Sequence, residues 1–314
     1  MTITQRIKKR SFKDRVTPDT YVFLGLGYVA KAMIETLPKK TRIYGTSRNP
    51  DNWSDSLKER VKGISFKGLI SAELKDALLK ADYVICSIPP NSDGDLFLRS
   101  LCELETDLTQ IMPRLKWMAY LSATSVYGDR QGGWAHEDDF LRPINARGRH
   151  RIMAELDWLE TGVKYGWPVH IFRLAGIYGG TYFEQSRNPF IRIKTGKARA
   201  IIKEGHVVNR IHAGDIVRAL KASILNPNTG QVYNVADGHP SPPQDVLDFA
   251  ADLIGAERPK RYDWKEADIS DMARSFYRET KRIDISRARD ELGFSPLYSD
   301  YKKGLSDIFK SGCH

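Results

Sequence analysis

The first 180 residues alternate short runs of β-branched and aromatic residues with longer amphipathic stretches. Runs typical of strands cover residues 21–27, 41–47, 83–90, 117–128 and 169–179, and stretches typical of helices cover 28–37, 72–80, 96–112 and 147–160. Strands that are each followed by a helix favour a parallel sheet with helices on both faces. We therefore predict an α/β fold with a doubly wound parallel sheet.

The pattern changes beyond about residue 180, where loops lengthen and polar turns separate shorter elements. A further strand is predicted over 232–237, and Ser241 with the two prolines after it opens an amphipathic helix that ends before Gly255. We predict a flexible arm over 1–18, a sheet domain over 19–185, and a smaller C-terminal lobe over 186–314 that partly returns to the sheet.

The composition narrows the class of protein. With 314 residues, 41% of them hydrophobic, the chain is long enough to bury a full core. It has no apolar run of 18 residues and no secretory signal, so we expect no membrane and a cytoplasmic location. Cys86, Cys102, Cys313 and the scattered histidines show no ligand spacing, so we predict no disulfide framework and no metal site.

The net charge of +10 raises the question of a nucleic-acid partner. Residues 1–15 hold six basic side chains against one acidic side chain, so about half of the excess lies in the polar arm. The remaining chain is modestly basic and shows no helix–turn–helix, zinc-finger or aromatic–basic RNA motif. We expect no nucleic-acid partner.

A glycine fingerprint lies between the first strand and the first helix. Gly25 permits a tight turn, Gly27 lets a pyrophosphate approach the backbone, and Ala30 allows helix and strand to pack closely. The N–H groups of Tyr28, Val29 and Ala30 open the helix and can bind phosphate. The spacing predicts a dinucleotide site of the Rossmann type, and a bare strand–helix turn is the alternative.

The end of the second strand bears on which dinucleotide binds. About 20 residues after the glycines, where an NAD site carries an acid, the chain has Thr46, Ser47 and Arg48. Arg48 can pair with the 2′-phosphate of NADP, and Ser47 can donate to it. We predict NADP, with NAD as the alternative and a solvated Arg48 as the other interpretation. Ser87, Ile88 and Pro89, at the end of the strand over 83–90, complete the predicted cofactor set.

Several motifs occur in a known order: the fingerprint, LSATSVYG over 121–128, RLAGIYG over 173–179, Arg210-Ile-His212, and LGFSP over 292–296. In these motifs the chain resembles the extended short-chain dehydrogenase/reductases, and among them the atypical NAD(P)-dependent epimerase/dehydratase-like proteins. The resemblance covers about residues 21–305. It implies a nicotinamide cofactor, a small polar substrate such as a nucleotide sugar, and by analogy a homodimer.

The chain departs from the family at the catalytic motif. The tyrosine and lysine of Tyr-x-x-x-Lys are replaced by Arg147 and Arg151, and the upstream Ser/Thr is Ala123. Arginine cannot exchange the proton that the tyrosine transfers. Ser122 and Thr124 are the neighbouring hydroxyls that can substitute for the missing Ser/Thr.

The two arginines lie one helical turn apart, at i and i+4. Together Arg147 and Arg151 can clamp an anionic substrate. The alternative is that Arg151 pairs with Glu155 on a solvated face.

The C-terminal lobe carries the residues predicted to bind substrate, namely Tyr178, Arg210 and His212. The region from Arg187 to Arg210 is strongly basic, which favours a phosphate-bearing substrate, with a solvated basic face as the alternative. His212 is either a general acid/base near neutral pH or a structural hydrogen-bonding group.

Two functions follow from these residues. The first is an NADP-dependent oxidoreductase or epimerase that acts on a nucleotide sugar or another small polar metabolite. The second is a non-enzymatic NADP-binding redox sensor or scaffold that kept the cofactor site and lost the chemistry.

Overall fold

The computed structural model describes residues 18–104, 107–180 and 187–312. All but the last residue of the predicted basic arm lies outside the described residues. Residues 181–186, which separate the two predicted domains, lie outside them as well.

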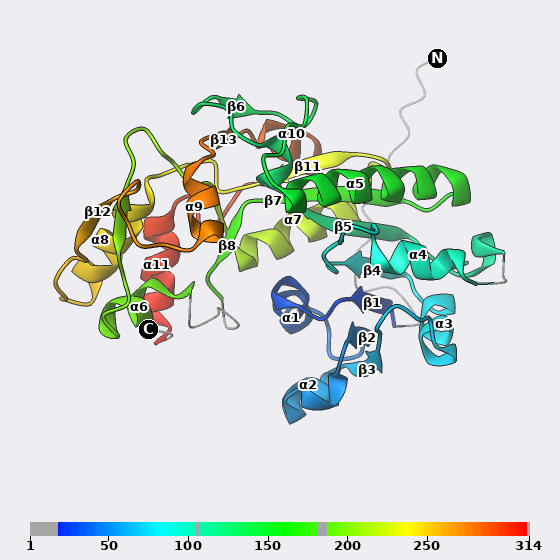
Figure 1. Ribbon diagram of the computed structural model, residues 1–314. Helices are drawn as coiled ribbons and strands as arrows, with labels where there is room; N and C mark the ends of the chain where they lie inside the picture. The colour runs from blue at the N-terminus through cyan, green and yellow to red at the C-terminus, as the bar shows by residue number, and fades with distance from the viewer. Residues whose placement is uncertain (1–17, 105–106, 181–186, 313–314) are drawn as a thin grey trace, which may run out of the picture.

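A seven-stranded sheet forms the centre of the molecule (Figure 1), with the strand order β11-β7-β5-β4-β1-β2-β3, and every neighbouring pair is parallel. The strands are β1 (Thr20–Leu24), β2 (Arg42–Ser47), β3 (Lys62–Ser65), β4 (Tyr83–Cys86), β5 (Trp117–Ala123), β7 (Val169–Leu174) and β11 (Val232–Val235). The order runs one way from β1 to β3 and the other way from β4 to β11. The predicted doubly wound α/β fold is confirmed, with its switch point between β1 and β4, where such folds bind ligands.

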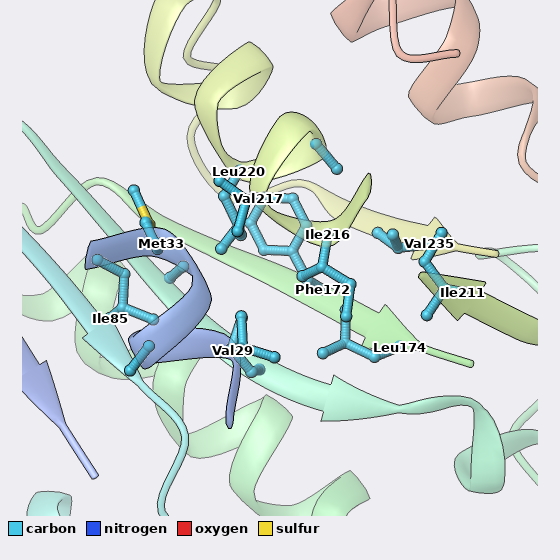
Figure 2. Close-up of a cluster of buried hydrophobic side chains, with 14 of the residues drawn as sticks. Val29, Met33, Ile85, Phe172, Leu174, Ile211, Ile216, Val217, Leu220 and Val235 are labelled. Atoms are coloured by element: carbon cyan, nitrogen blue, oxygen red, sulfur yellow. The ribbon is translucent and has the colours of Figure 1, made fainter. Parts of the chain in front are cut away.

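Two hydrophobic cores cover the two faces of the sheet. Along β1 the side chains alternate, so that Tyr21 and Phe23 join one core while Val22 and Leu24 join the other. The first core packs against α1 (Tyr28–Glu35) and α7 (Ala213–Leu225), with Met33 and Leu220 among its members (Figure 2). The second core packs against α3 (Ala72–Leu79), α4 (Leu96–Cys102) and α5 (Ala146–Tyr165). Burial on both faces explains why β1, β4 and β5 are almost continuously apolar.

Several predicted elements have different bounds in the structure. The helix expected over 96–112 stops at Cys102, and a separate 3₁₀ turn, Leu108–Gln110, begins where the Asp107 side chain accepts the N–H of Thr109. The strand expected over 117–128 ends at Ala123 and continues as a 3₁₀ turn, Thr124–Tyr127. Helix α2 (Asp55–Arg60) and edge strand β3 were not predicted. Few of their side chains are buried, so they leave little hydrophobic pattern.

The chain after residue 186 contributes both to the central sheet and to a separate small core. Strand β11 and helix α7 belong to the central sheet and its core. A small third core gathers side chains from α6 (Pro189–Lys194), α8 (Pro243–Leu253) and α11 (Tyr301–Lys310). Three short parallel pairs also form: β8 (Gly176–Tyr178) with β10 (Arg210–His212), β9 (Ala200–Ile202) with β12 (Arg261–Asp263), and β6 (Trp134–Ala135) with β13 (Arg282–Ile283). The last pair adds Ala135 and Ile283 to the first core. Helices α9 (Asp271–Tyr277) and α10 (Ser286–Leu292) complete the described elements.

Candidate cofactor and substrate site

The turn after β1 ties three strand ends together. Gly25 has a φ of +88°, its N–H donates to Thr46 Oγ1 at 2.8 Å, and its carbonyl accepts the Ser87 hydroxyl at 2.8 Å. A Cβ on Gly25 would lie 3.0 Å from Ser87 Oγ and 3.1 Å from Ile88 Cγ1. The fold itself therefore requires a glycine at Gly25, both for its φ and for its close contacts.

Gly27 is different, because packing leaves it free. Its φ of −91° suits any residue, and a Cβ there would meet only Ser87 Oγ, at 3.9 Å. Gly27 caps α1, whose first N–H groups have no acceptor within the helix. The side chains of Val29 and Ala30 are buried in the core, so only their backbone is available to a ligand. A cradle that a side chain would fill, at a helix N-terminus, fits a dinucleotide pyrophosphate.

The remaining predicted cofactor residues lie at the ends of neighbouring strands. Ser47 ends β2, its hydroxyl accepts the N–H of Asn49 at 3.2 Å, and Arg48 after it is exposed. Pro89 is exposed after β4. Burial raises the pKa of the Tyr28 phenol, whose hydroxyl has no partner among the described residues.

A cavity of about 660 Å³ opens at the carboxyl ends of β5 and β7; we call it the sheet-end cavity. Since the strands are parallel, it lies at the same edge of the sheet as the glycine turn. It brings together the predicted residues Thr124, Arg147 and Arg151. Its other polar lining residues are Ser125, Asn145, Arg187, Asp271 and Ser275.

Ser122, also predicted as a catalytic candidate, does not line the sheet-end cavity. Its side chain is buried, and its hydroxyl donates to Glu155 Oε1 at 2.5 Å. Arg173 holds the same carboxylate, with Nη2 2.8 Å from Glu155 Oε2. The alternative in which Arg151 pairs with Glu155 on a solvated face is therefore wrong, because Glu155 is buried with Arg173. Arg151 instead donates from Nη1 to the Leu121 carbonyl at 3.2 Å.

Arg173 is the centre of this buried network. Its Nη1 donates to the Tyr127 hydroxyl and to the Glu137 carbonyl, both at 2.9 Å. Burial lowers the pKa of Arg173, but the hydrogen bond and charge of Glu155 outweigh it and raise that pKa overall. Burial raises the pKa of Tyr127 to about 12, so its phenol stays protonated and donates to Asn234 Oδ1 at 2.7 Å.

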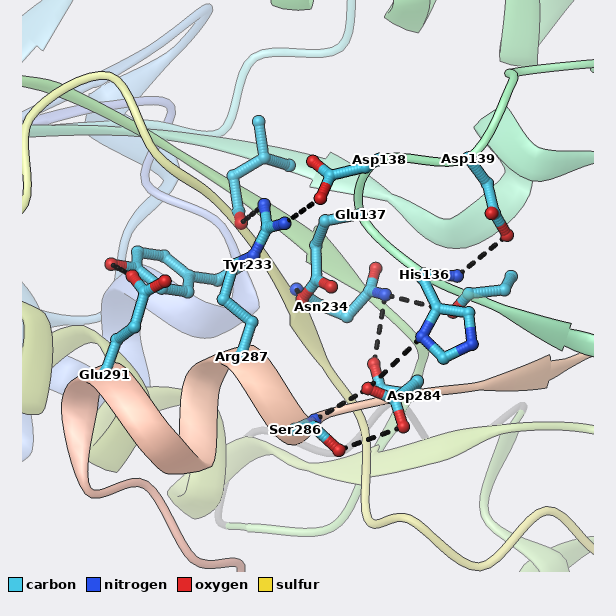
Figure 3. A network of polar contacts seen from close by, with 12 residues as sticks. His136, Glu137, Asp138, Asp139, Tyr233, Asn234, Asp284, Ser286, Arg287 and Glu291 are labelled. Carbon is cyan, nitrogen blue, oxygen red and sulfur yellow. Dashed lines mark hydrogen bonds and ion pairs between the residues drawn. The ribbon is translucent and has the colours of Figure 1, made fainter.

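The network continues into the loop around Glu137 (Figure 3). Glu137 Oε1 accepts the Asn234 N–H at 2.9 Å, and the Asn234 amide donates to the Asp284 carbonyl at 3.0 Å. Arg287 on α10 pairs with Asp138. These contacts join the loop after β6 to β11 and α10. Arg173 links the loop to the end of β7, where the next residue, Leu174, lines the sheet-end cavity.

A second cavity of about 480 Å³, the lobe cavity, adjoins the first and shares Gly176, Ile177, Arg187 and Phe276 with it. Its lining adds Arg192, Arg199 and Arg210 to Arg187, with Tyr178, Tyr277 and Tyr301 as aromatic walls. None of the described residues that line it is acidic. The lobe cavity therefore favours an anion with an aromatic or apolar body.

Two of the predicted substrate residues lie in the lobe cavity. Arg210 Nη1 donates to Ser241 Oγ at 2.8 Å and to the Val208 carbonyl at 3.0 Å, which fixes the guanidinium in the wall. The Tyr178 hydroxyl donates to the Asp300 carbonyl at 3.3 Å. Burial lowers the pKa of Arg210 and raises that of Tyr178.

His212, the third predicted substrate residue, lines neither cavity. It caps α7, with Nδ1 accepting the Gly214 N–H at 3.1 Å, and its ring lies 3.9 Å from that of Tyr298. Burial lowers the pKa of His212 to about 4. The imidazole is thus neutral at pH 7, and its contacts fit the structural interpretation.

Several cavity residues were missed in the sequence. Asn145 caps α5 through a hydrogen bond to the Gly148 N–H at 2.9 Å, a signal that a search for helix caps would have found. Asp271, Ser275 and Phe276 come from α9, which the hydrophobic pattern did not predict. Nothing in the sequence places α9 at the sheet edge.

The described part of the chain contains no group of three or more His, Cys, Asp or Glu side chains suited to a metal ion. Within the same part, no helix is long and apolar enough to cross a membrane.

Comparison with known proteins identifies a family model, a related sequence and similar solved structures. The family model described as "NAD dependent epimerase/dehydratase family" matches residues 24–236. Protein YeeZ of Escherichia coli (strain K12) is 32% identical over 232 residues, which cover 72% of this chain and 74% of YeeZ.

Two solved structures are similar over most of the chain. A functionally unknown conserved protein from Silicibacter pomeroyi DSS is 39% identical with a TM-score of 0.83, over 93% of this chain and 99% of that one. The dTDP-glucose 4,6-dehydratase of Bacillus anthracis str. Ames, in complex with NAD, is 15% identical with a TM-score of 0.75, over 94% and 96%. At that identity the dehydratase shares the fold alone.

Proposed function

The chain belongs to the NAD-dependent epimerase/dehydratase family, and we propose that it is an NADP-dependent oxidoreductase or epimerase acting on a nucleotide sugar or another small phosphate-bearing metabolite. One observation carries the proposal. Two adjoining cavities open at the sheet edge that holds the glycine turn, and their described lining contains several arginines but only one carboxylate, that of Asp271.

The cofactor preference rests on the end of β2. Arg48 is exposed beside Ser47, at the place where an NAD-specific site carries an acid. A guanidinium there pairs with the 2′-phosphate of NADP.

The substrate is assigned to the two cavities according to their charge. The lobe cavity, with Arg192, Arg199 and Arg210, takes the diphosphate, and its aromatic walls take the nucleoside. The reacting group then lies in the sheet-end cavity, where Arg147 and Arg151 hold an anionic substituent in place of the usual tyrosine and lysine. Arg187 lines both cavities and links the two anion sites.

The chemistry is divided between cofactor and protein. When bound, the nicotinamide supplies hydride transfer. The arginines orient the substrate and stabilise negative charge but cannot exchange protons. Among the described residues that line the sheet-end cavity, the groups that can move a proton are the Asp271 carboxyl and the hydroxyls of Thr124, Ser125 and Ser275. We assign proton transfer to Asp271, with Thr124 as hydrogen-bonding partner of the reacting oxygen.

The test is turnover with a panel of nucleotide sugars and either NADP or NADPH, followed by cofactor absorbance and product mass. We expect Arg147→Leu to lower kcat/KM for the active substrate about tenfold or more. Arg278→Leu is the matched control, since Arg278 is exposed just after α9 and lines neither cavity.

The second function, a redox sensor or scaffold, is favoured by the replacement of tyrosine and lysine by Arg147 and Arg151. A sensor should bind NADP and NADPH with clearly different affinities and show no turnover with any member of the panel. That pair of results would reject the enzyme in favour of the sensor.

We further propose a homodimer formed through α5. Met153, Leu156 and Val163 are 56%, 50% and 87% exposed and share one helix face with the exposed Arg149 and Glu160. In an antiparallel α5 pair, Met153 meets Leu156 of a second copy while Arg149 meets Glu160. The face is therefore complementary to itself in both apolar surface and charge.

Light scattering after size-exclusion chromatography tests this dimer. Leu156→Glu is expected to give a monomer, while Leu297→Glu, at a similarly exposed leucine elsewhere, is expected to stay dimeric. A dimer that survives Leu156→Glu would contradict an interface on α5.

A further inference from the structure

A buried carboxyl group lies next to the arginine wall of the lobe cavity without lining that cavity. Asp237 follows β11, its side chain is 3% exposed, and its backbone N–H donates to the Arg210 carbonyl at 2.7 Å. Among the described residues, the one hydrogen bond to its side chain comes from the His239 N–H, to Oδ1 at 2.9 Å. Asp237 is therefore a buried acid with one neutral donor and a neighbouring cation.

Arg210 is this neighbouring cation, and among the described residues only one of its three guanidinium nitrogens is hydrogen-bonded. Its Nη1 is bound to Ser241 and Val208, while Nε and Nη2 have no partner among the described residues. The guanidinium lines the lobe cavity. An anion bound there would lie close to Asp237 and would compete with it for the charge of Arg210.

Asp237 has its own route to solvent. It lines a separate cavity of about 330 Å³, together with Gly238, His239 and Trp134, and half of the Trp134 side chain is exposed. A proton can reach the carboxyl from this side while the lobe cavity is occupied. Arg210 thus lines the lobe cavity and Asp237 lines the separate cavity, while the backbones of the two residues are hydrogen-bonded to each other.

We propose that Asp237 is a specificity-determining residue of the lobe cavity, which takes up a proton from solvent when a multiply charged anion binds beside Arg210. Without ligand, the negative charge of ionised Asp237 offsets part of the positive charge of Arg210. With Asp237 protonated, the wall presents the full charge of Arg210 to the anion. The inference rests on the part of the proposed function that puts an anion in the lobe cavity, and does not depend on that anion being a nucleotide sugar.

The surroundings of Asp237 agree with this exchange. Burial raises the pKa of Asp237 to about 7, the charge of Arg210 opposes that rise, and nearby Asp300 adds to it. A bound anion adds negative charge and raises the pKa further. The other titratable or charged groups facing Asp237 are Tyr178 on β8, His239 on its own loop, and Asp284 and Arg289 around the separate cavity.

The direction of the pH dependence follows from the linkage between proton binding at Asp237 and anion binding in the lobe cavity. Well below pH 7 Asp237 is already protonated, and binding takes up little. Between the free and bound pKa values the ligand drives uptake, so affinity falls as pH rises from 7 toward 8.5. A rise in pKa of about one unit corresponds to about a sixfold loss of affinity between pH 6.5 and 8.5 and an uptake of about half a proton near pH 7.5.

The experiment is calorimetry of the full chain at pH 6.5, 7.5 and 8.5, in buffers of different ionisation enthalpy, which counts protons directly. The two probes are sulfate and UDP-glucose, because the charge of each is constant over this range. We expect proton uptake with both probes, and we expect Asp237→Asn to abolish both the uptake and the loss of affinity at high pH.

Two controls separate Asp237 from its neighbours. Asp252→Asn makes the same change at an exposed carboxylate on α8, paired with Arg258, and His239→Gln removes the adjacent imidazole. Both variants should keep the uptake. Infrared difference spectra should also show a carboxyl C=O band appearing on sulfate binding in the parent and absent in Asp237→Asn.

The outcomes separate the inference from the proposed function. Uptake with sulfate but no binding of UDP-glucose supports the role of Asp237 and counts against the nucleotide-sugar proposal. Binding of either probe without uptake, uptake that persists in Asp237→Asn, or no binding of either probe overturns the inference.

Discussion

The buried network around Arg173 and the two cavities beside it use the same side chain in opposite ways. Arg173 is buried, and Glu155, Tyr127 and the Glu137 carbonyl occupy its donors. The arginines of the lobe cavity line a space in which no described residue is acidic. Basic charge by itself therefore says little about ligands in this protein. What distinguishes the lobe cavity is that its arginines meet no carboxylate within its described lining.

The glycines after β1 repeat this contrast. Gly25 is required by its φ and by contacts with Ser87 and Ile88. Gly27 has an ordinary backbone and open space where a Cβ would lie. Among the arginines and among the glycines alike, one residue is held by contacts within the fold, and another of the same type borders open space.

The largest expected effect is at Arg173. Arg173→Met should lower the free energy of unfolding by about 3–5 kcal/mol, because it leaves Glu155 buried without a counter-charge. Urea denaturation measures this, and Arg147→Met, at an exposed arginine, should change stability by less than about 0.5 kcal/mol. Equal losses in the two variants would remove the contrast.

Gly27→Val tests the contrast between the glycines. We expect cofactor affinity to fall at least about 100-fold, because a branched side chain fills the space assigned to the pyrophosphate. NADPH fluorescence enhancement measures the affinity, and the thermal midpoint should change little. Gly25→Ala should instead lower the thermal midpoint, since φ at Gly25 is positive. Full NADPH binding by folded Gly27→Val would refute the site.

The pH dependence of stability tests whether His212 serves the fold rather than a ligand. Its folded pKa of about 4 lies below the ordinary value of 6.5, so the unfolded chain takes up a proton that the native state does not. Stability should thus fall as pH drops from 6.5 to 4, by on the order of 3 kcal/mol from this residue. His212→Asn keeps a capping oxygen and should show a weaker loss of stability. If His212→Asn instead removed an inflection near pH 6.5 from kcat/KM, a catalytic role would be indicated.

The double change Arg147→Tyr with Arg151→Lys restores the family motif and so tests whether the cavity arginines act on a ligand. We expect the native activity to fall about tenfold or more, because the anion clamp is lost while the fold is kept. Cofactor consumption by parent and variant on one substrate panel measures this, with NADPH affinity checked in both. Undiminished activity would rule out the clamp.

The smallest effect is expected at Arg48. Arg48→Asp should reduce the preference for NADP over NAD by about tenfold or reverse it, because a carboxylate repels the 2′-phosphate. Calorimetric titration of both cofactors at fixed salt gives the ratio. Equal affinities of the parent for NADP and NAD would contradict the assignment of Arg48.

The features that could be predicted from the sequence are those whose determinants lie close together along the chain. The glycine turn depends on a spacing of a few residues, and the central strands are buried on both faces, which leaves continuous apolar runs. Element ends were less predictable: α4 ends at Cys102, and Asp107 caps a separate 3₁₀ turn within the range predicted as one helix.

The candidate site could be predicted only in part, because its residues meet through the tertiary fold. Glu155 and Arg151 share a helix, which suggested a pair, but Arg173 on β7 claims the carboxylate. Asp271 reaches the sheet-end cavity from α9, a short helix with little apolar pattern. The basic residues in the sequence indicated anion binding. The tertiary fold determines which arginines are buried with a carboxylate and which line the cavities.

The late return of the chain to its sheet has a consequence for biosynthesis. Strand β7 is buried on both faces and is covered along one edge by β11, yet α6, β9, β10 and α7 lie between the two strands in the sequence. During translation β7 therefore emerges well before its neighbour and presents an open, apolar edge to other chains. The interval between the synthesis of β7 and that of β11 is the period in which a nascent copy most needs protection from aggregation.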